Sequence, residues 1–99
     1  MKELLTDFNN RYNELNEALQ KALWLQEPFS DETKLKFIDY FNLCAEEWLF
    51  RRAGYVYDPV WEAWENGMKQ YSKDFRVREL WMQERNSNSY YGFELPVPS

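Results

Sequence analysis

The chain has 99 residues, of which 44% are hydrophobic and 29% are charged, so it belongs to the globular class and is excluded from the disordered one. Its net charge of −5 argues against a nucleic-acid partner, because phosphate binding needs a positively charged surface. A single cysteine, Cys44, excludes an internal disulfide, and no apolar run approaches the length of a membrane span, which together predict a cytoplasmic protein without membrane insertion.

The first predicted element is a long amphipathic helix over residues 2–25. Its apolar side chains fall on one narrow stripe at helical spacing: Leu4, Leu5, Phe8, Tyr12, Leu15, Leu19, Ala22 and Leu23. Such a stripe fits either a wall of the chain's own bundle or a seam between two copies. The candidate interface residues are Phe8, Tyr12, Leu15, Leu19 and Trp24. Trp24 points away from the stripe, and it either packs with Phe29 over the turn or faces a partner.

The second predicted helix spans residues 31–53 and is apolar over most of its circumference. Ser30 or Asp31 can cap its start, and Gly54 follows it as a left-handed C′ residue. Its main face is predicted to hold Leu35, Ile38, Phe41, Ala45, Trp48 and Leu49, widened by Phe37 and Cys44, with Leu43 and Phe50 almost opposite. A helix that is apolar nearly all round is normally the central one of a bundle.

Two shorter helices follow. Asp58 as N-cap and Pro59 at the first helical position predict the start of the third. Its stripe of Val60, Trp61, Trp64, Met68 and Tyr71 indicates core packing in preference to a ligand groove. Gly67 beside the stripe is explained by the close approach of a neighbouring backbone. The fourth helix follows Asp74 and is expected to turn Val77, Leu80 and Trp81 inward.

These elements predict an all-α fold, a compact bundle of about four helices with helix 31–53 at its centre. The bundle domain covers residues 1–85, and residues 86–99 form a C-terminal tail. The tail has no helical period and ends in two prolines separated by one residue. It is therefore either loose or docked on the bundle through Tyr90, Tyr91 and Phe93.

Two adjacent acids, Glu46 and Glu47, are the first candidates for chemistry. Neighbouring residues on a helix diverge by about 100°, so the two carboxylates cannot converge on one substrate atom. Glu47 is expected to form an exposed ion pair with Arg51, four residues on. Glu46 lies beside Asn42 at the edge of the apolar face. It has three interpretations: a structural bridge to Arg52 or Arg78, a solvated edge, or a binding role.

No residue is predicted to be catalytic, to bind a metal or to hold a cofactor. The chain has no histidine, which the di-iron pattern of helical bundles requires and which Cys44 would need as an activating base. The three glycines are too dispersed for a phosphate-binding loop. An enzyme is therefore the less favoured class.

Three segments between Tyr40 and Trp81 carry a resemblance: "YFNLCAEEW", "VWEAWENGM" and "VRELW". This region resembles small all-helical bacterial domains of unknown function, in which an aromatic-rich helix with an acidic pair precedes a helix with Trp and Gly. Some of those domains sit beside membrane-spanning segments, which this chain lacks. The resemblance implies an all-helical fold and assigns no catalytic residues.

Two functions from different classes remain. The favoured one is an intracellular interaction or regulatory module that presents a helical surface to a protein partner or to a second copy, as a homodimer through the first helix. It is supported by the aromatic content of 19% and by the acidic surface. The alternative is a small-molecule binder or enzyme with a pocket formed by Asn42, Glu46, Arg78 and Trp81.

Overall fold

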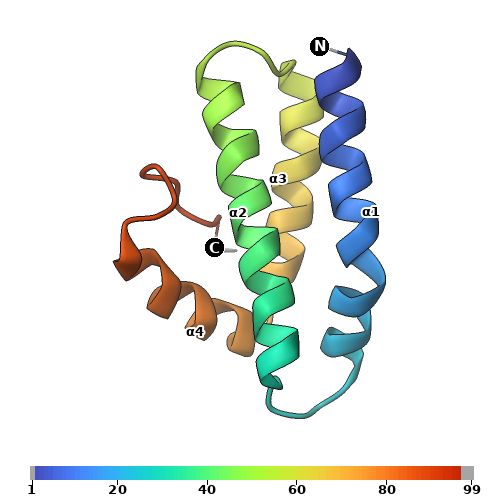
Figure 1. The fold of residues 1–99 in the computed structure, drawn as a ribbon, viewed down its shortest axis with the longest axis vertical. Coiled ribbons are helices and arrows are strands. Elements are labelled where there is room, and N and C mark those ends of the chain that lie inside the picture. The colour runs from blue at the N-terminus through green and yellow to red at the C-terminus, as the bar shows by residue number, and fades with distance from the viewer. Residues whose placement is uncertain (1, 97–99) are drawn as a thin grey trace.

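The computed structural model describes residues 2–96 and confirms an all-α bundle. Its four helices are α1 (Lys2–Trp24), α2 (Asp31–Arg52), α3 (Asp58–Ser72) and α4 (Phe75–Glu84), followed by a 3₁₀ turn at Arg85–Ser87. In Figure 1, α1, α2 and α3 run along the long axis of the molecule, and α4 lies obliquely to the left of the lower half of α2. None of the helices in the described range is long and apolar enough to cross a membrane.

Local capping chemistry sets the starts of α2 and α4. The Ser30 hydroxyl accepts a hydrogen bond of 3.1 Å from the Thr33 amide, and the Asp74 carboxylate accepts one of 2.8 Å from the Arg76 amide. The expected cap of α3 is wrong by one residue. Tyr57 is the N-cap there and makes no side-chain cap bond, and Asp58 is already helical. Its carboxylate instead pairs with Arg51 at 2.7 Å.

The buried face of α2 is rotated from the predicted one by about one residue, or 100°. Phe37, Phe41 and Cys44 are buried as predicted, but Leu43, expected almost opposite the main face, is buried as well, whereas Leu35, expected on the main face, is 62% exposed. Leu49 is exposed as well. Ring contacts from α2 reach all three other helices, which makes it the central helix: Tyr40 with Tyr12 and Tyr71, and Phe41 with Trp81.

The first part of the tail docks on the bundle. Tyr90, Phe93 and Leu95 are buried, and the Phe93 ring lies 5.7 Å from Trp81 and 6.0 Å from Trp48. Tyr91, the third expected anchor, is exposed. The packed core therefore extends beyond residue 85. Residues 97–99 of the predicted tail lie outside the described part of the chain.

Candidate functional site

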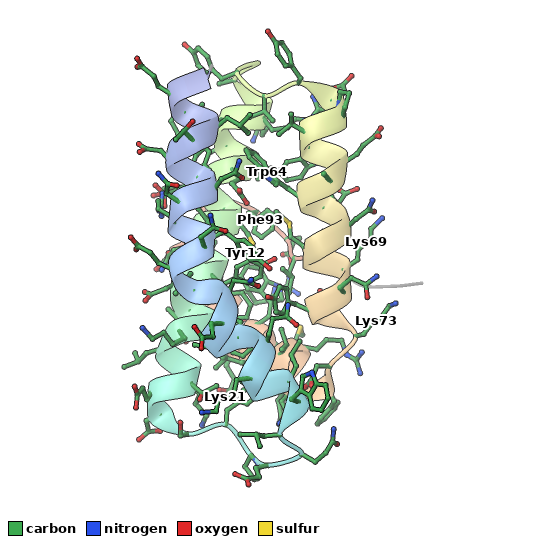
Figure 2. The ribbon with its side chains drawn as sticks, turned by 90° about the vertical axis from the view of Figure 1, so that its right-hand side faces the viewer. Tyr12, Lys21, Trp64, Lys69, Lys73 and Phe93 are labelled. Carbon is green, nitrogen blue, oxygen red and sulfur yellow. The ribbon has the colours of Figure 1, made fainter. Side chains whose placement is uncertain are left out.

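A cavity of about 250 Å³ lies between the three long helices. Seven residues line it: Asn9 and Tyr12 from α1, Tyr40 and Glu47 from α2, and Ala63, Trp64 and Gly67 from α3. Asn9 and Ala63 are exposed, so they mark its mouth. Figure 2 shows Tyr12 and Trp64 between α1 and α3.

Gly67 keeps the α3 wall of this cavity open. A Cβ atom at Gly67 would have no other atom within 4 Å apart from its own helix and chain neighbours. The predicted close approach of a neighbouring backbone is therefore wrong. Glycine inside a helix costs up to about 1 kcal/mol relative to alanine. At Gly67 the missing side chain leaves open space at the cavity wall and does not serve tight packing.

Glu47 is the one acid that lines the cavity, and it is only 5% exposed. Its predicted pair with Arg51 does not form. No donor or cation in residues 2–96 bonds directly to its carboxyl group. No fully enclosed side-chain oxygen in that range lacks a partner, so the Glu47 oxygens must reach the cavity.

The surroundings of Glu47 favour its protonated form. Burial raises the pKa of Glu47 to about 8, the more distant Arg11 guanidinium opposes the rise, and the Glu46 carboxylate adds to it. An acid whose pKa lies close to neutral pH can gain or lose a proton when its surroundings change slightly. Buried acids with displaced pKa values in a cavity are typical of binding and catalytic sites.

The hydroxyl groups of Tyr12 and Tyr71 are already engaged in hydrogen bonds. Tyr12 donates to Asn16 Oδ1 at 2.9 Å, and Gln20 donates to the Tyr71 oxygen at 2.9 Å. The remaining bond, 3.0 Å between the two tyrosine oxygens, must therefore be donated by Tyr71 to Tyr12. Burial raises the pKa of Tyr40 and of the neighbouring Cys44 thiol, so both groups stay neutral. The Tyr12 hydroxyl therefore has no spare proton for a ligand in the cavity.

The four residues of the predicted pocket do not come together. Asn42 is exposed, and Trp81 is buried on the α4 side against Phe41, at 5.2 Å between ring centroids. Arg78 donates to the carbonyl oxygens of Ser72 and Lys73. Glu46 does pair with an arginine, but the partner is Arg11 on α1, at 2.5 Å.

The candidate interface of the first helix is mostly internal. Phe8, Leu15 and Leu19 are buried in the chain's own core, and Tyr12 lines the cavity. The apolar stripe of α1 therefore forms a wall of the chain's own bundle, which is the first of its two interpretations. Trp24 is 84% exposed and does not pack with Phe29, which stacks on Phe37 at 4.9 Å.

Comparisons of the chain with protein-family models, with curated proteins and with solved structures give no match. The resemblance of residues 40–81 to bacterial helical domains therefore stays a prediction.

Proposed function

We propose that this protein binds a small molecule in the cavity between α1, α2 and α3, with Glu47 as the main polar contact. The proposal rests on one observation: Glu47 is 5% exposed and lines the cavity, and its carboxyl oxygens reach the cavity without a direct bond to any donor in residues 2–96. Burying a polar group without compensation costs about 1–3 kcal/mol in proteins, so a folded chain tends to satisfy such groups. A ligand group in the cavity would supply the missing partner.

The composition of the walls supports the same function. Small-molecule sites are concave and mostly apolar, with a few convergent polar groups that orient the ligand. Here Tyr12, Tyr40 and Trp64 provide aromatic surface, and Glu47 provides the orienting group. This cavity takes the place of the pocket that the sequence suggested around Asn42.

A fragment screen tests the proposal. We expect fragments that bind the wild-type chain at millimolar concentration to raise its melting temperature and to change the fluorescence of Trp64. The matched control is Gly67→Leu, whose side chain grows into the open space at the cavity wall. Binding should disappear in this variant while its circular dichroism spectrum remains helical. Fragments that bind both proteins equally, or no binding fragment at all, would refute the cavity as the site.

A second function, the interaction or regulatory module, is supported by an exposed aromatic corner. We define the Trp24 corner as Trp24, Leu25 and Phe75, where the end of α1 meets the start of α4. Trp24 and Phe75 are 84% and 66% exposed, and the neighbouring Arg76 donates to the Leu25 carbonyl oxygen at 2.7 Å. Exposed apolar clusters commonly mark protein contacts.

Light scattering tests the self-association form of this second function. A homodimer through the Trp24 corner should appear at tens of micromolar protein and should dissociate in the Trp24→Ala variant. Tyr57→Ala is the matched control. It removes an exposed aromatic side chain from the connection between α2 and α3, at the other end of the bundle. A monomer mass for the wild-type chain at these concentrations removes the homodimer.

A further inference from the structure

The charges around the cavity restrict the kind of ligand that it can take. Among its seven lining residues there is one acid, Glu47, and no lysine or arginine. Arg11 is the cation whose charge Glu47 senses, but its guanidinium is bonded to Glu46. An anionic ligand would therefore meet a carboxyl group and no pairing cation. A neutral apolar ligand would leave the carboxyl group without a partner.

The rings and hydroxyl groups restrict the ligand further. Tyr12, Tyr40 and Trp64 line the cavity, and the negative faces of aromatic rings attract cations. The Tyr12 hydroxyl proton is already donated to Asn16. A ligand that brings its own N–H donors finds an acceptor in the Glu47 carboxyl group. An ammonium group has donors and no acceptor.

Building on the proposed function, we infer that the ligand is a small organic ammonium ion. Its ammonium group pairs with the ionised Glu47 carboxylate, and its carbon skeleton lies against Tyr12, Tyr40 and Trp64. The volume of about 250 Å³ is below the usual range of drug-sized pockets, about 300–1,000 Å³, so the amine is a small one.

Binding of such an ion must be coupled to the release of a proton from Glu47. The pKa of Glu47 is about 8, so near neutral pH its proton has to leave before the ion pair can form. The proton passes to solvent, and no other bond forms or breaks. The affinity should therefore rise with pH up to about pH 8, and it should fall again at the higher pH where the ammonium ion loses its own proton.

The neighbours of Glu47 with shifted pKa values keep their ionisation forms over this range. On α1, Arg11 has a raised pKa and stays charged. On α2, burial raises the pKa of both Tyr40 and Cys44, which stay neutral, and the Glu46 carboxyl group is bonded to Arg11. On α3, burial raises the pKa of Tyr71, and the α3 residues that line the cavity carry no charge.

Calorimetric titration of the full chain with benzylamine tests the inference, with benzyl alcohol and benzoate as neutral and anionic probes of similar size. We expect benzylamine to bind most tightly of the three. Its affinity should fall about tenfold to a hundredfold between about pH 8 and about pH 6. Binding near neutral pH should release close to one proton, read from titrations in buffers of different ionisation enthalpy.

Two variants assign the effect to one carboxyl group. Glu47→Gln should abolish both the preference for the amine and its pH dependence, whereas Glu46→Gln should retain them. Should Glu47→Gln not fold, the carboxyl carbon resonance of Glu47 in the wild-type chain gives the same answer. Its titration midpoint must move to lower pH when benzylamine is added.

The results separate this inference from the proposed function. If benzyl alcohol binds as tightly as benzylamine and Gly67→Leu blocks both, the cavity is a binding site and the ammonium inference is wrong. The ammonium inference is equally wrong if benzylamine binding does not depend on pH. If none of the three probes binds and a fragment screen also fails, the proposed function fails with it.

Discussion

The guanidinium group of Arg11 on α1 bonds to Glu46 at 2.5 Å and not to Glu47, the next residue of α2. Both carboxyl groups interact electrostatically with Arg11, but only the partly exposed Glu46 forms an ion pair with it. The buried Glu47 is thereby left facing the cavity. Two adjacent acids of one helix thus differ in their surroundings, one in an interhelical ion pair and one in the wall of the cavity.

Glu47 should make the stability of the fold fall as pH rises. Its pKa is raised from 4.5 to about 8, so between these values the folded chain keeps a proton that the unfolded chain releases. The contribution of Glu47 to the free energy of unfolding should therefore be fully present below about pH 4.5 and should drop by about 3–5 kcal/mol by pH 8. Urea denaturation across this range measures the drop.

Glu47→Gln and Glu46→Gln form the matched pair for this prediction. The glutamine at position 47 cannot ionise, so the decline in stability should largely disappear in that variant. The change at position 46 removes an interhelical ion pair but leaves Glu47 in place, so the decline should persist. Parallel curves for the wild-type chain and the position-47 variant would contradict the assignment.

Gly67→Ala should stabilise the protein by about 0.5–1 kcal/mol. The new Cβ atom meets no neighbour within 4 Å, and the residue lies within α3, so only the gain in helix propensity remains. Gly54→Ala is the control, because Gly54 has a φ of +89°. The left-handed backbone there should make the same substitution destabilising by about 1–2 kcal/mol. Thermal unfolding of both variants measures the contrast, and a loss of stability in Gly67→Ala would show that the wall is closed.

The helices could be predicted closely because their signals are local. Ser30, Asp74 and Gly54 terminate helices through bonds and dihedral angles set within a few residues. The facing of α2 could not be predicted in the same way. When a helix is apolar nearly all round, its sequence does not indicate which face will be buried. The buried face of α2 therefore depends on where α1, α4 and the tail pack.

Because the buried face of α2 was predicted incorrectly, the candidate site around Glu47 was not predicted either. Tyr40, Cys44 and Glu47 are spaced by four and three residues and share one side of the helix, which the sequence does contain as a signal. This spacing places Glu47 on the same side of α2 as Cys44. It predicts burial of Glu47 only if Cys44 is already known to lie at the centre of the core. The partnership of Arg11 with Glu46 joins residues 35 positions apart and has no local signal.

Arg76 should be needed to hold the α1–α2 connection against α4. Its guanidinium bonds to both carboxylate oxygens of Asp74, donates to the carbonyl oxygens of Leu25 and Glu27, and lies 4.5 Å from the centre of the Phe29 ring. A lysine cannot make this planar set of contacts, so Arg76→Lys should lower the free energy of unfolding by about 1–3 kcal/mol. Urea denaturation at neutral pH gives the value.

Arg85→Lys is the control for Arg76, because Arg85 makes a more exposed pair with Glu94. Its cost should stay below about 1 kcal/mol. Hydrogen bonding to Arg76 also lowers the pKa of Asp74, so the contribution of this pair is present above about pH 4 and is lost as pH falls through the folded-state pKa. Equal losses in the two lysine variants would mean that the Arg76 contacts add nothing to an ordinary surface pair.

The docked tail should contribute to the stability of the whole bundle. Phe93 is buried against Trp48 and Trp81, so Phe93→Ala removes a large core side chain and should cost about 3–5 kcal/mol. Tyr91→Ala is the control, because Tyr91 is two residues away and its side chain is exposed. Its free energy of unfolding should stay within about 0.5 kcal/mol of the wild-type value. Hydrogen exchange in α4 reports whether the loss is shared by the bundle. Faster exchange at Leu80 and Trp81 in Phe93→Ala is expected because those residues and the tail form one core, whereas unchanged exchange there would make the tail a separate attachment.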